Sequence, residues 1–216
     1  MMIEEGMSFE EALKIAQEKG YAEKDPTADV EGHDACRKVC ILASLAFGKH
    51  VYPNQVETEG ITNISLEDVS YIENAGGVIK LLGQIKYIND NEIAAFVSPA
   101  VVYNGSQLAS VKDVFNAILV RGDAVGDVCF YGPGAGKLPT ASAVVADIID
   151  CAKHSDRKKI FGWGEGSENY VVDYKEKIEM PFYVRAKATP NEVNSKFADV
   201  KFLSRKGQPS DEVAFI

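Results

Sequence analysis

The residues best suited to chemistry gather in the acidic segment 20–38. Its carboxylates precede a basic pair and are Glu23, Asp25, Asp29, Glu31 and Asp34. Asp34 and Lys38 are four positions apart, so on a helix both side chains lie on one face, one turn apart. Carboxylates this dense repel one another unless a cation lies among them. A substrate ammonium group together with Lys38 would supply that cation, and this favours a site for a small amino acid or amino aldehyde.

The same segment has an ordinary structural explanation. Acidic residues are common at helix N-termini because they complement the helix dipole, and Asp34 with Lys38 would then be a simple i,i+4 ion pair. Such pairs occur on many solvent-exposed helices and contribute little to stability. Spacing alone therefore favours the ordinary explanation.

A second candidate is the glycine-rich stretch 131–140, which reads YGPGAGKLPT. Backbone amides in such a turn, ahead of a helix, attract anions and let a ligand approach the chain closely. A P-loop would need glycine at Tyr131 and Ser or Thr at Leu138. A dinucleotide-binding fingerprint would need its third glycine at Lys137. A tight strand-to-helix turn, with Pro139 in the first helical turn, explains the stretch equally well.

Composition limits the classes of function. The chain has 216 residues, which suits one large domain or one domain with a small appendix. Its net charge of −9 argues against nucleic acid or an anionic membrane as a partner. No signal peptide and no apolar run of membrane-spanning length is evident. Small-molecule chemistry in solution fits these properties.

The cysteines form neither a disulfide framework nor a metal site. Cys36 and Cys40 share a helix face near His33, but no second pair of Cys or His follows at ligand spacing. Core packing is therefore the expected role of the two thiols, and no metal ligand is predicted. The small number of cysteines is typical of a reducing cytoplasm.

Apolar periodicity and turn signals predict an α+β fold with a mainly antiparallel sheet and flanking helices. Ser8 and Glu11 form a capping box ahead of a helix that Gly20 ends. An acidic loop over 21–34 and a helix over 33–47, apolar nearly all round and therefore buried, follow. Further helices are expected at 66–75 and 140–152, and strands at 78–87, 93–103, 114–121 and 127–131. The turns between strands are expected at 89–91 and 104–105.

Several of these stretches, in order, closely resemble homoserine dehydrogenases. They read GMSFEEAL at 6–13, DPTADVEGHDACRK at 25–38, ILASLAFG at 41–48, NAI at 116–118, GDAVG at 122–126, FYGPGAG at 130–136 and LPTASAVVAD at 138–147. The resemblance runs from about residue 3 to residue 153. It implies a catalytic and substrate-binding domain over 1–155. The composition changes after His154 and the glycine-rich stretch 162–166 is typical of a linker, which we expect over 156–178. The tail, with strands expected at 180–188, 200–206 and 211–216, resembles part of a regulatory ACT domain over 179–216.

The resemblance implies an activity and its residues. The family interconverts aspartate β-semialdehyde and homoserine with NAD or NADP, on the route to threonine, methionine and isoleucine. Lys38 and Asp34 match the catalytic pair, and Glu23 and Asp29 match the carboxylates that bind the substrate. The loop near the cofactor matches Gly134, Ala135 and Gly136. A cytoplasmic homodimer or tetramer is implied as well. This resemblance reverses the interpretation that spacing alone favoured.

The chain also departs from the family pattern. It starts close to the substrate-domain helix, without the Rossmann domain that holds most of the family's nucleotide site. The 216 residues alone are therefore expected to be nearly inactive. In the tail, the helix between the first two ACT-like strands is nearly absent. The alternative is a non-enzymatic module that dimerises and binds amino acids.

Overall fold

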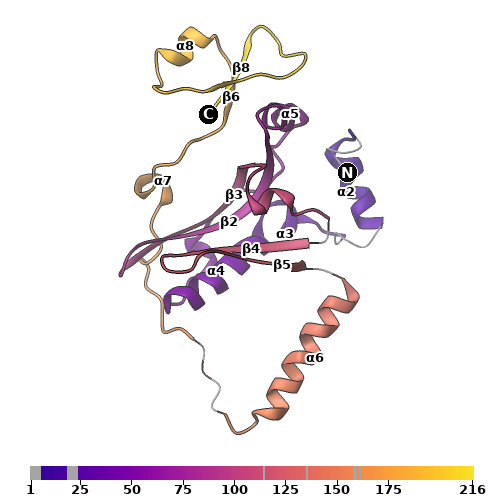
Figure 1. Ribbon diagram of the computed structural model, residues 1–216, viewed down its shortest axis with the longest axis vertical. Helices are drawn as coiled ribbons and strands as arrows, with labels where there is room; N and C mark the ends of the chain where they lie inside the picture. Colours follow the sequence, from indigo (N-terminus) through magenta and orange to yellow (C-terminus); the bar gives the residue numbers. More distant parts are fainter. Residues whose placement is uncertain (1–5, 19–23, 114, 135, 158–159, 161) are drawn as a thin grey trace.

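The computed structural model describes residues 6–18, 24–113, 115–134, 136–157, 160 and 162–216. The helices are α2 (Phe9–Glu18), α3 (Thr27–Val30), α4 (His33–Phe47), η1 (Pro53–Gln55), α5 (Leu66–Asn74), η2 (Gln107–Ser110), α6 (Lys137–Lys153), α7 (Tyr174–Lys177) and α8 (Pro190–Asn194). The strands are β1 (Glu57–Thr58), β2 (Gly77–Asn89), β3 (Glu92–Tyr103), β4 (Phe115–Gly122), β5 (Gly126–Pro133), β6 (Val184–Lys187), β7 (Phe202–Leu203) and β8 (Glu212–Phe215). The pairing is mainly antiparallel and the expected α+β class is confirmed (Figure 1).

The largest sheet is the support for α4. Its strand order is β1-β3-β2, with β2 and β3 antiparallel along almost their whole length and β1 parallel to β3. One face of α4 packs on this sheet, where Val39 and Ala43 meet Val97 in a buried apolar cluster. Burial of such side chains contributes roughly 1.5–3 kcal/mol each. The sheet thus fixes the position of the helix that carries Asp34 and Lys38.

Two predictions about these elements need correction. Helix α4 is buried on one face only, because Ile41 and Leu45 are more than half exposed. The strands that follow do not extend the first sheet. Asn104 and Gly105 lead into η2, and among the described strands β4 pairs only with β5. The turn residues predicted where the chain changes direction, but they did not predict which strands would pair.

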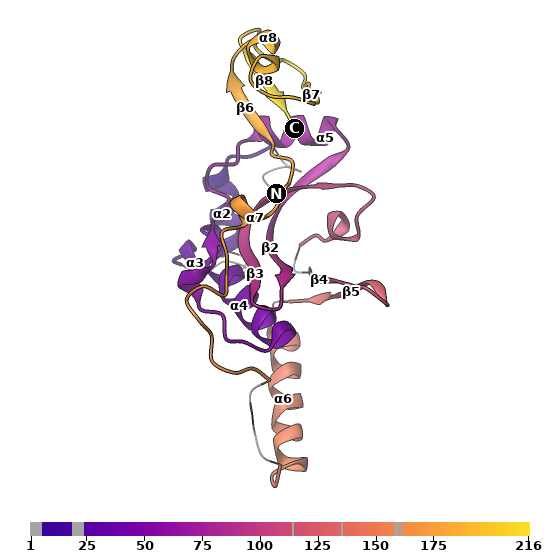
Figure 2. The same ribbon diagram turned by 90° about the vertical axis from the view of Figure 1, so that its left-hand side faces the viewer.

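The β4–β5 hairpin and α6 extend away from the first sheet. Figures 1 and 2 show α6 projecting from one end of the molecule. It starts three residues before the predicted 140, at Lys137, and none of its residues is buried. None of the described helices meets the length and hydropathy that crossing a bilayer requires.

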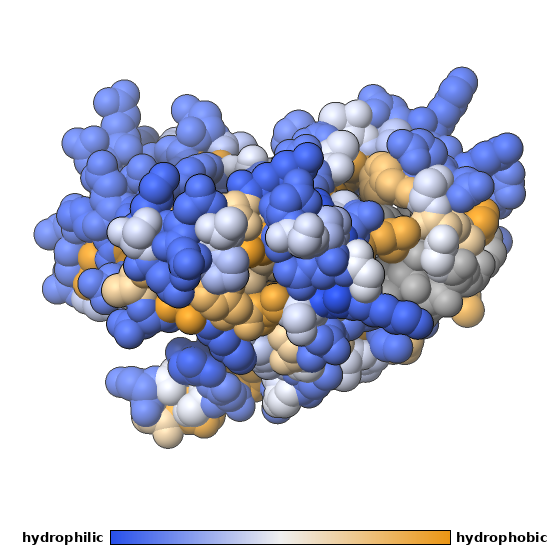
Figure 3. Space-filling view, turned by 90° about the horizontal axis from the view of Figure 1, so that it is seen from above, coloured by the Kyte–Doolittle hydropathy of each residue, from blue (hydrophilic) through white to orange (hydrophobic). Residues whose placement is uncertain are grey.

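The C-terminal strands form a separate sheet in the order β6-β8-β7. This sheet lies at the opposite end of the molecule from α6 (Figures 1 and 2). Tyr71 and Ile72 of α5 pack against Leu203 and Ala214 of the C-terminal sheet. Viewed from above, the surface is largely hydrophilic with small apolar patches (Figure 3). The apolar contact with α5 is closed to solvent, because Tyr71, Ile72 and Ala214 in it are fully buried.

Candidate functional site

Helix α4 is held at both ends by glycines in the left-handed conformation. Gly32 has φ +79° ahead of the helix, and Gly48 has φ +73° after it. The Cys36 amide donates to the Gly32 carbonyl at 2.9 Å, so the first turn is closed despite the absence of a side-chain cap. Residues other than glycine rarely adopt this backbone conformation. The first turn, which carries Asp34, is therefore set by backbone geometry.

Asp34 and Lys38 form an ion pair on this helix. Lys38 Nζ lies 2.7 Å from Asp34 Oδ2, and the side chains are 61% and 45% exposed for Lys38 and Asp34. At this exposure the pair adds little stability, so stability does not account for its presence. Both groups remain accessible to a small polar molecule in solution.

The acidic segment ahead of α4 is more ordered than the expected loop. It contains the one-turn helix α3, with Asp29 in its first turn. Asp25 Oδ1 accepts hydrogen bonds from the Thr27 hydroxyl at 2.6 Å and the Thr27 amide at 3.1 Å, which lower the pKa of this carboxyl group. Pro26 and a single turn of four residues gave no apolar period from which sequence analysis would predict a helix.

Gly60 holds the acidic segment against the chain that follows β1. A Cβ atom at Gly60 would lie 2.3 Å from the Val30 carbonyl oxygen and 2.5 Å from the Glu31 Cα. The Ile61 amide donates to that same carbonyl at 2.9 Å. The Thr62 hydroxyl donates to Glu31 Oε1 at 2.5 Å. The acidic segment is therefore fixed from both sides, by α4 and by residues 60–62.

The glycine-rich loop lies at the start of α6. Gly136 precedes the helix with φ +116° and no side-chain cap. Gly134 lies directly against the Asn116 side chain, because a Cβ atom at Gly134 would be 2.0 Å from Asn116 Nδ2. The close approach of Asn116 accounts for the glycine at 134, and the helix start without a side-chain cap suits an anionic group. Of the remaining sequence-predicted site residues, Glu23 and Ala135 lie outside the described residues.

The two thiols of α4 are core residues, as predicted. Burial, and secondarily the neighbouring Cys36, raises the pKa of Cys40 to about 12. Such a thiol is a poor metal ligand at neutral pH because the thiolate form is required. In the described part of the chain no group of His, Cys, Asp and Glu side chains is arranged to hold a metal ion.

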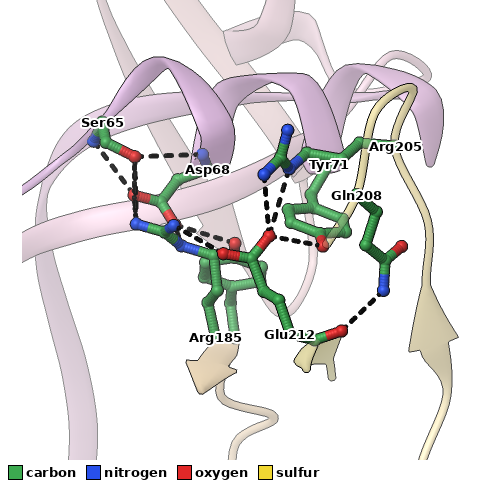
Figure 4. A network of polar contacts seen from close by, with 8 residues as sticks. Ser65, Asp68, Tyr71, Arg185, Arg205, Gln208 and Glu212 are labelled. Atoms are coloured by element: carbon green, nitrogen blue, oxygen red, sulfur yellow. Dashed lines mark hydrogen bonds and ion pairs between the residues drawn. The ribbon is translucent and has the colours of Figure 1, made fainter. Parts of the chain in front are cut away.

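Sequence analysis missed a polar network between α5 and the C-terminal sheet. Asp68 lies at its centre and accepts hydrogen bonds from Arg185 Nε at 2.7 Å and from the Tyr183 hydroxyl at 2.9 Å (Figure 4). Burial raises the pKa of Asp68, but the hydrogen bonds from Ser65 and Tyr183 and the charge of Arg185 outweigh it, and the net shift is downward. The capping box of Ser65 and Asp68 was a local signal for the helix start, but not for partners more than a hundred residues away.

Two cavities lie beside the segment that joins α6 to the C-terminal sheet. One of about 230 Å³ lies along α4, and its lining residues are Arg37, Cys40, Ile41, Ser44, His50, Val51, Pro53 and Trp163. The other, of about 530 Å³, is lined by Tyr52, Asn54, Gln55, Gly166, Ser167, Glu168 and Val171. Neither lining includes a residue that the sequence predicted for catalysis or substrate binding.

Comparison with known proteins identifies the family of this chain. The family model for homoserine dehydrogenase matches residues 1–149. The homoserine dehydrogenase of Bacillus subtilis is 44% identical over 153 residues, which are 71% of this chain and 35% of that protein. Homoserine dehydrogenases are a family of NAD(P)-dependent oxidoreductases. The chain belongs to the homoserine dehydrogenase family.

Solved structures agree with the family assignment. A homoserine dehydrogenase from Thiobacillus denitrificans superposes with a TM-score of 0.83 and 34% identity, over 99% of this chain and 52% of that one. A hyperthermophilic archaeal homoserine dehydrogenase mutant in complex with NADPH superposes with a TM-score of 0.53 and 28% identity, over 69% of this chain and 41% of that one. The chain spans about a third of the length of the curated relatives that it matches. The alternative of a non-enzymatic module is not favoured by these findings.

Proposed function

We propose that this chain provides the substrate side of a homoserine dehydrogenase site that interconverts aspartate β-semialdehyde and homoserine. The observation that carries the proposal is the Asp34–Lys38 ion pair, 2.7 Å long, on the first turns of a helix fixed by a buried core. Asp29, and Glu23 by resemblance, would bind the substrate ammonium group. The pathway would be the synthesis of threonine, methionine and isoleucine.

Lys38 would handle the proton in this reaction. In the reducing direction a hydride reaches the aldehyde carbon, and the carbonyl oxygen then needs one proton, which the Lys38 ammonium group donates. The positive charge of Lys38 also stabilises the alkoxide as it develops. In the reverse direction the Lys38 amine accepts the proton of the homoserine hydroxyl. Asp34 orients Lys38, because the carboxylate holds Nζ from one turn away.

NAD or NADP, when bound, supplies or accepts the hydride. Gly134, Ala135 and Gly136 would approach it through their backbone. The uncapped start of α6 and the positive φ of Gly136 support this assignment, because free amide groups at a helix start suit an anionic ligand. Most of the nucleotide site is expected outside these residues, so the 216 residues alone should show little turnover.

We also propose that the chain forms a homodimer or tetramer in the cytoplasm. The support is an apolar surface on the β4–β5 hairpin and α6, which we call the hairpin–helix face. Its exposed apolar residues are Ile118, Val120, Phe130, Val144, Val145, Ile148 and Ile149. Exposed apolar side chains gathered on neighbouring elements often mark a protein interface. Residues 1–155 would form the catalytic domain, 156–178 the linker and 179–216 a partial ACT-like unit.

The decisive experiment is homoserine binding by the purified 216-residue chain, followed by calorimetry and by amide chemical shifts. We expect binding to wild type and at least tenfold weaker binding to Lys38→Met. The matched control is Lys86→Met, since Lys86 is an exposed lysine of β2 and should bind homoserine as wild type does. The ligand control is 2-aminobutyrate, which lacks the hydroxyl group.

The outcomes separate the alternatives. Homoserine binding that Lys38→Met leaves unchanged would remove Lys38 from the site. Equal affinity for 2-aminobutyrate would indicate an amino-acid-binding module without selectivity for the reacting group. A parallel assay of homoserine-dependent NAD or NADP reduction should give little activity, and substantial turnover would mean that these residues already hold the nucleotide.

A further inference from the structure

Residues 162–168 of the connector between α6 and the C-terminal sheet lie along the end of α4. The His50 amide donates to the Gly164 carbonyl, and the Gly164 amide donates to the Gly48 carbonyl, both at 2.9 Å. Gly166 is packed so closely that a Cβ atom there would lie 2.0 Å from the His50 carbonyl oxygen. The connector, which its glycines suggested was a simple linker, is therefore docked on the domain that carries α4.

One side-chain hydrogen bond reinforces this docking. Trp163 Nε1 donates to His50 Nδ1 at 2.9 Å, and the His50 ring also packs on Tyr52 with ring centroids 4.2 Å apart. The indole N–H can only donate, so Nδ1 must carry no proton for this bond to exist. A protonated imidazole has N–H donors at both nitrogens and offers no acceptor.

We propose that His50 and Trp163 form a proton-sensitive latch that holds the connector on the end of α4. When Nδ1 gains a proton, its new N–H faces the indole N–H and the bond is lost, whereas the backbone bonds of Gly164 remain. Trp163 then separates from His50 and gains access to water. Both residues line the 230 Å³ cavity along α4, so opening the latch removes one wall of that cavity.

The neighbouring charged groups define the setting of the latch. Arg37 and Cys40 of α4 line the cavity with His50, and Tyr52 packs on the His50 ring. Lys49 and Glu165 are the nearest charged residues along the chain. Lys49 is directed elsewhere, with Nζ over the Tyr170 ring at 4.7 Å from its centroid.

The test uses the single tryptophan of the chain. Its indole N–H resonance and its quenching by acrylamide are followed from pH 8 to pH 5, with far-ultraviolet circular dichroism to show that the fold persists. We expect a step in indole shift and accessibility within the range in which histidines ordinarily titrate, about pH 5–8. His50→Asn should abolish the step, because the asparagine oxygen can accept the indole bond but does not titrate over that range.

The matched control is His154→Asn, which removes another imidazole, one that lies against Asp150 on α6. This variant should keep the step. A wild type without any step, or a step that persists in His50→Asn, would overturn the proposal. Failure of homoserine binding would leave it untouched, because the latch does not depend on the proposed reaction.

Discussion

Arg185 Nε lies 2.7 Å from Asp68 Oδ1, although the two residues are 117 positions apart in the chain. The same guanidinium group reaches Glu212 Oε2 at 3.1 Å, so it bridges α5 and strand β8 (Figure 4). Glu212 in turn accepts hydrogen bonds from Arg205 at 2.8 Å and from the Tyr71 hydroxyl at 2.9 Å. The C-terminal sheet is therefore held on α5 by charge as well as by apolar packing.

This network should make the docking of the C-terminal sheet sensitive to acid. Hydrogen bonds and positive charges lower the pKa of Asp68 and Glu212, although burial opposes the shift in both. A carboxyl group with a lowered pKa in the folded state stabilises it above the unfolded pKa, roughly 3.9 to 4.3, and loses that contribution as the pH falls through the folded value. Protection of the α5 and β6 amides from hydrogen exchange, measured relative to the intrinsic exchange rate at each pH, should therefore fall below about pH 4. Protection that is constant from pH 7 to pH 3 would contradict this.

Replacing the central carboxylate tests the same contact at neutral pH. Asp68→Asn leaves Arg185 without its charged partner and should lower the free energy of unfolding by on the order of 2 kcal/mol. This is less than for a fully buried pair, because Arg185 is 29% exposed. The control is Asp127→Asn, which breaks the exposed pair with Arg121 and should not change stability measurably. Equal effects of the two substitutions in urea unfolding would contradict the assignment.

Gly60 should be required for the shape of the acidic segment. Gly60→Ala places a methyl group where the Val30 carbonyl and the Glu31 backbone already lie, so the segment must shift, at a cost of about 1–3 kcal/mol. Homoserine binding should weaken together with stability. Gly105→Ala is the matched control, because a Cβ atom there has no neighbour within 4 Å. Wild-type homoserine affinity in a folded Gly60→Ala variant would show that homoserine binding does not depend on Gly60.

The hairpin–helix face should mediate self-association. Phe130 is 62% exposed, so Phe130→Asp should leave the protomer folded but weaken the dimer at least tenfold in sedimentation at micromolar concentration. Val125→Asp is the control, since Val125 is 69% exposed but lies in the turn between β4 and β5. A wild type that is monomeric at all concentrations, or two variants with equal effects, would remove this face as the interface.

Local signals in the sequence predicted most helices and strands, and long-range contacts explain what was missed. The bounds of α4 were predicted because Gly48 and the apolar run are adjacent to the helix itself. The Ser8 and Glu11 capping box was confirmed by reciprocal bonds of 3.0 and 3.2 Å. The separation of β4 from β3 depends on strand choice across the molecule, which turn residues do not determine.

The candidate site was predictable only in part for the same reason. The i,i+4 spacing predicted that Asp34 and Lys38 would share a face, and the resemblance supplied their proposed roles. The contacts of Gly60 with Val30 and of His50 with Trp163 join segments 30 and 113 residues apart. Hydrophobic periodicity concerns residues that are close in sequence, so it does not predict such long-range contacts.

The lack of burial along α6 has a consequence for the chain in dilute solution. A helix of seventeen residues gains only marginal stability from its backbone, and most helices depend on packing of an apolar face. The apolar side chains of α6 have no buried position within the described chain. The helical content of this protein should therefore rise with its concentration, so that secondary structure here is a property of the assembly rather than of the single molecule.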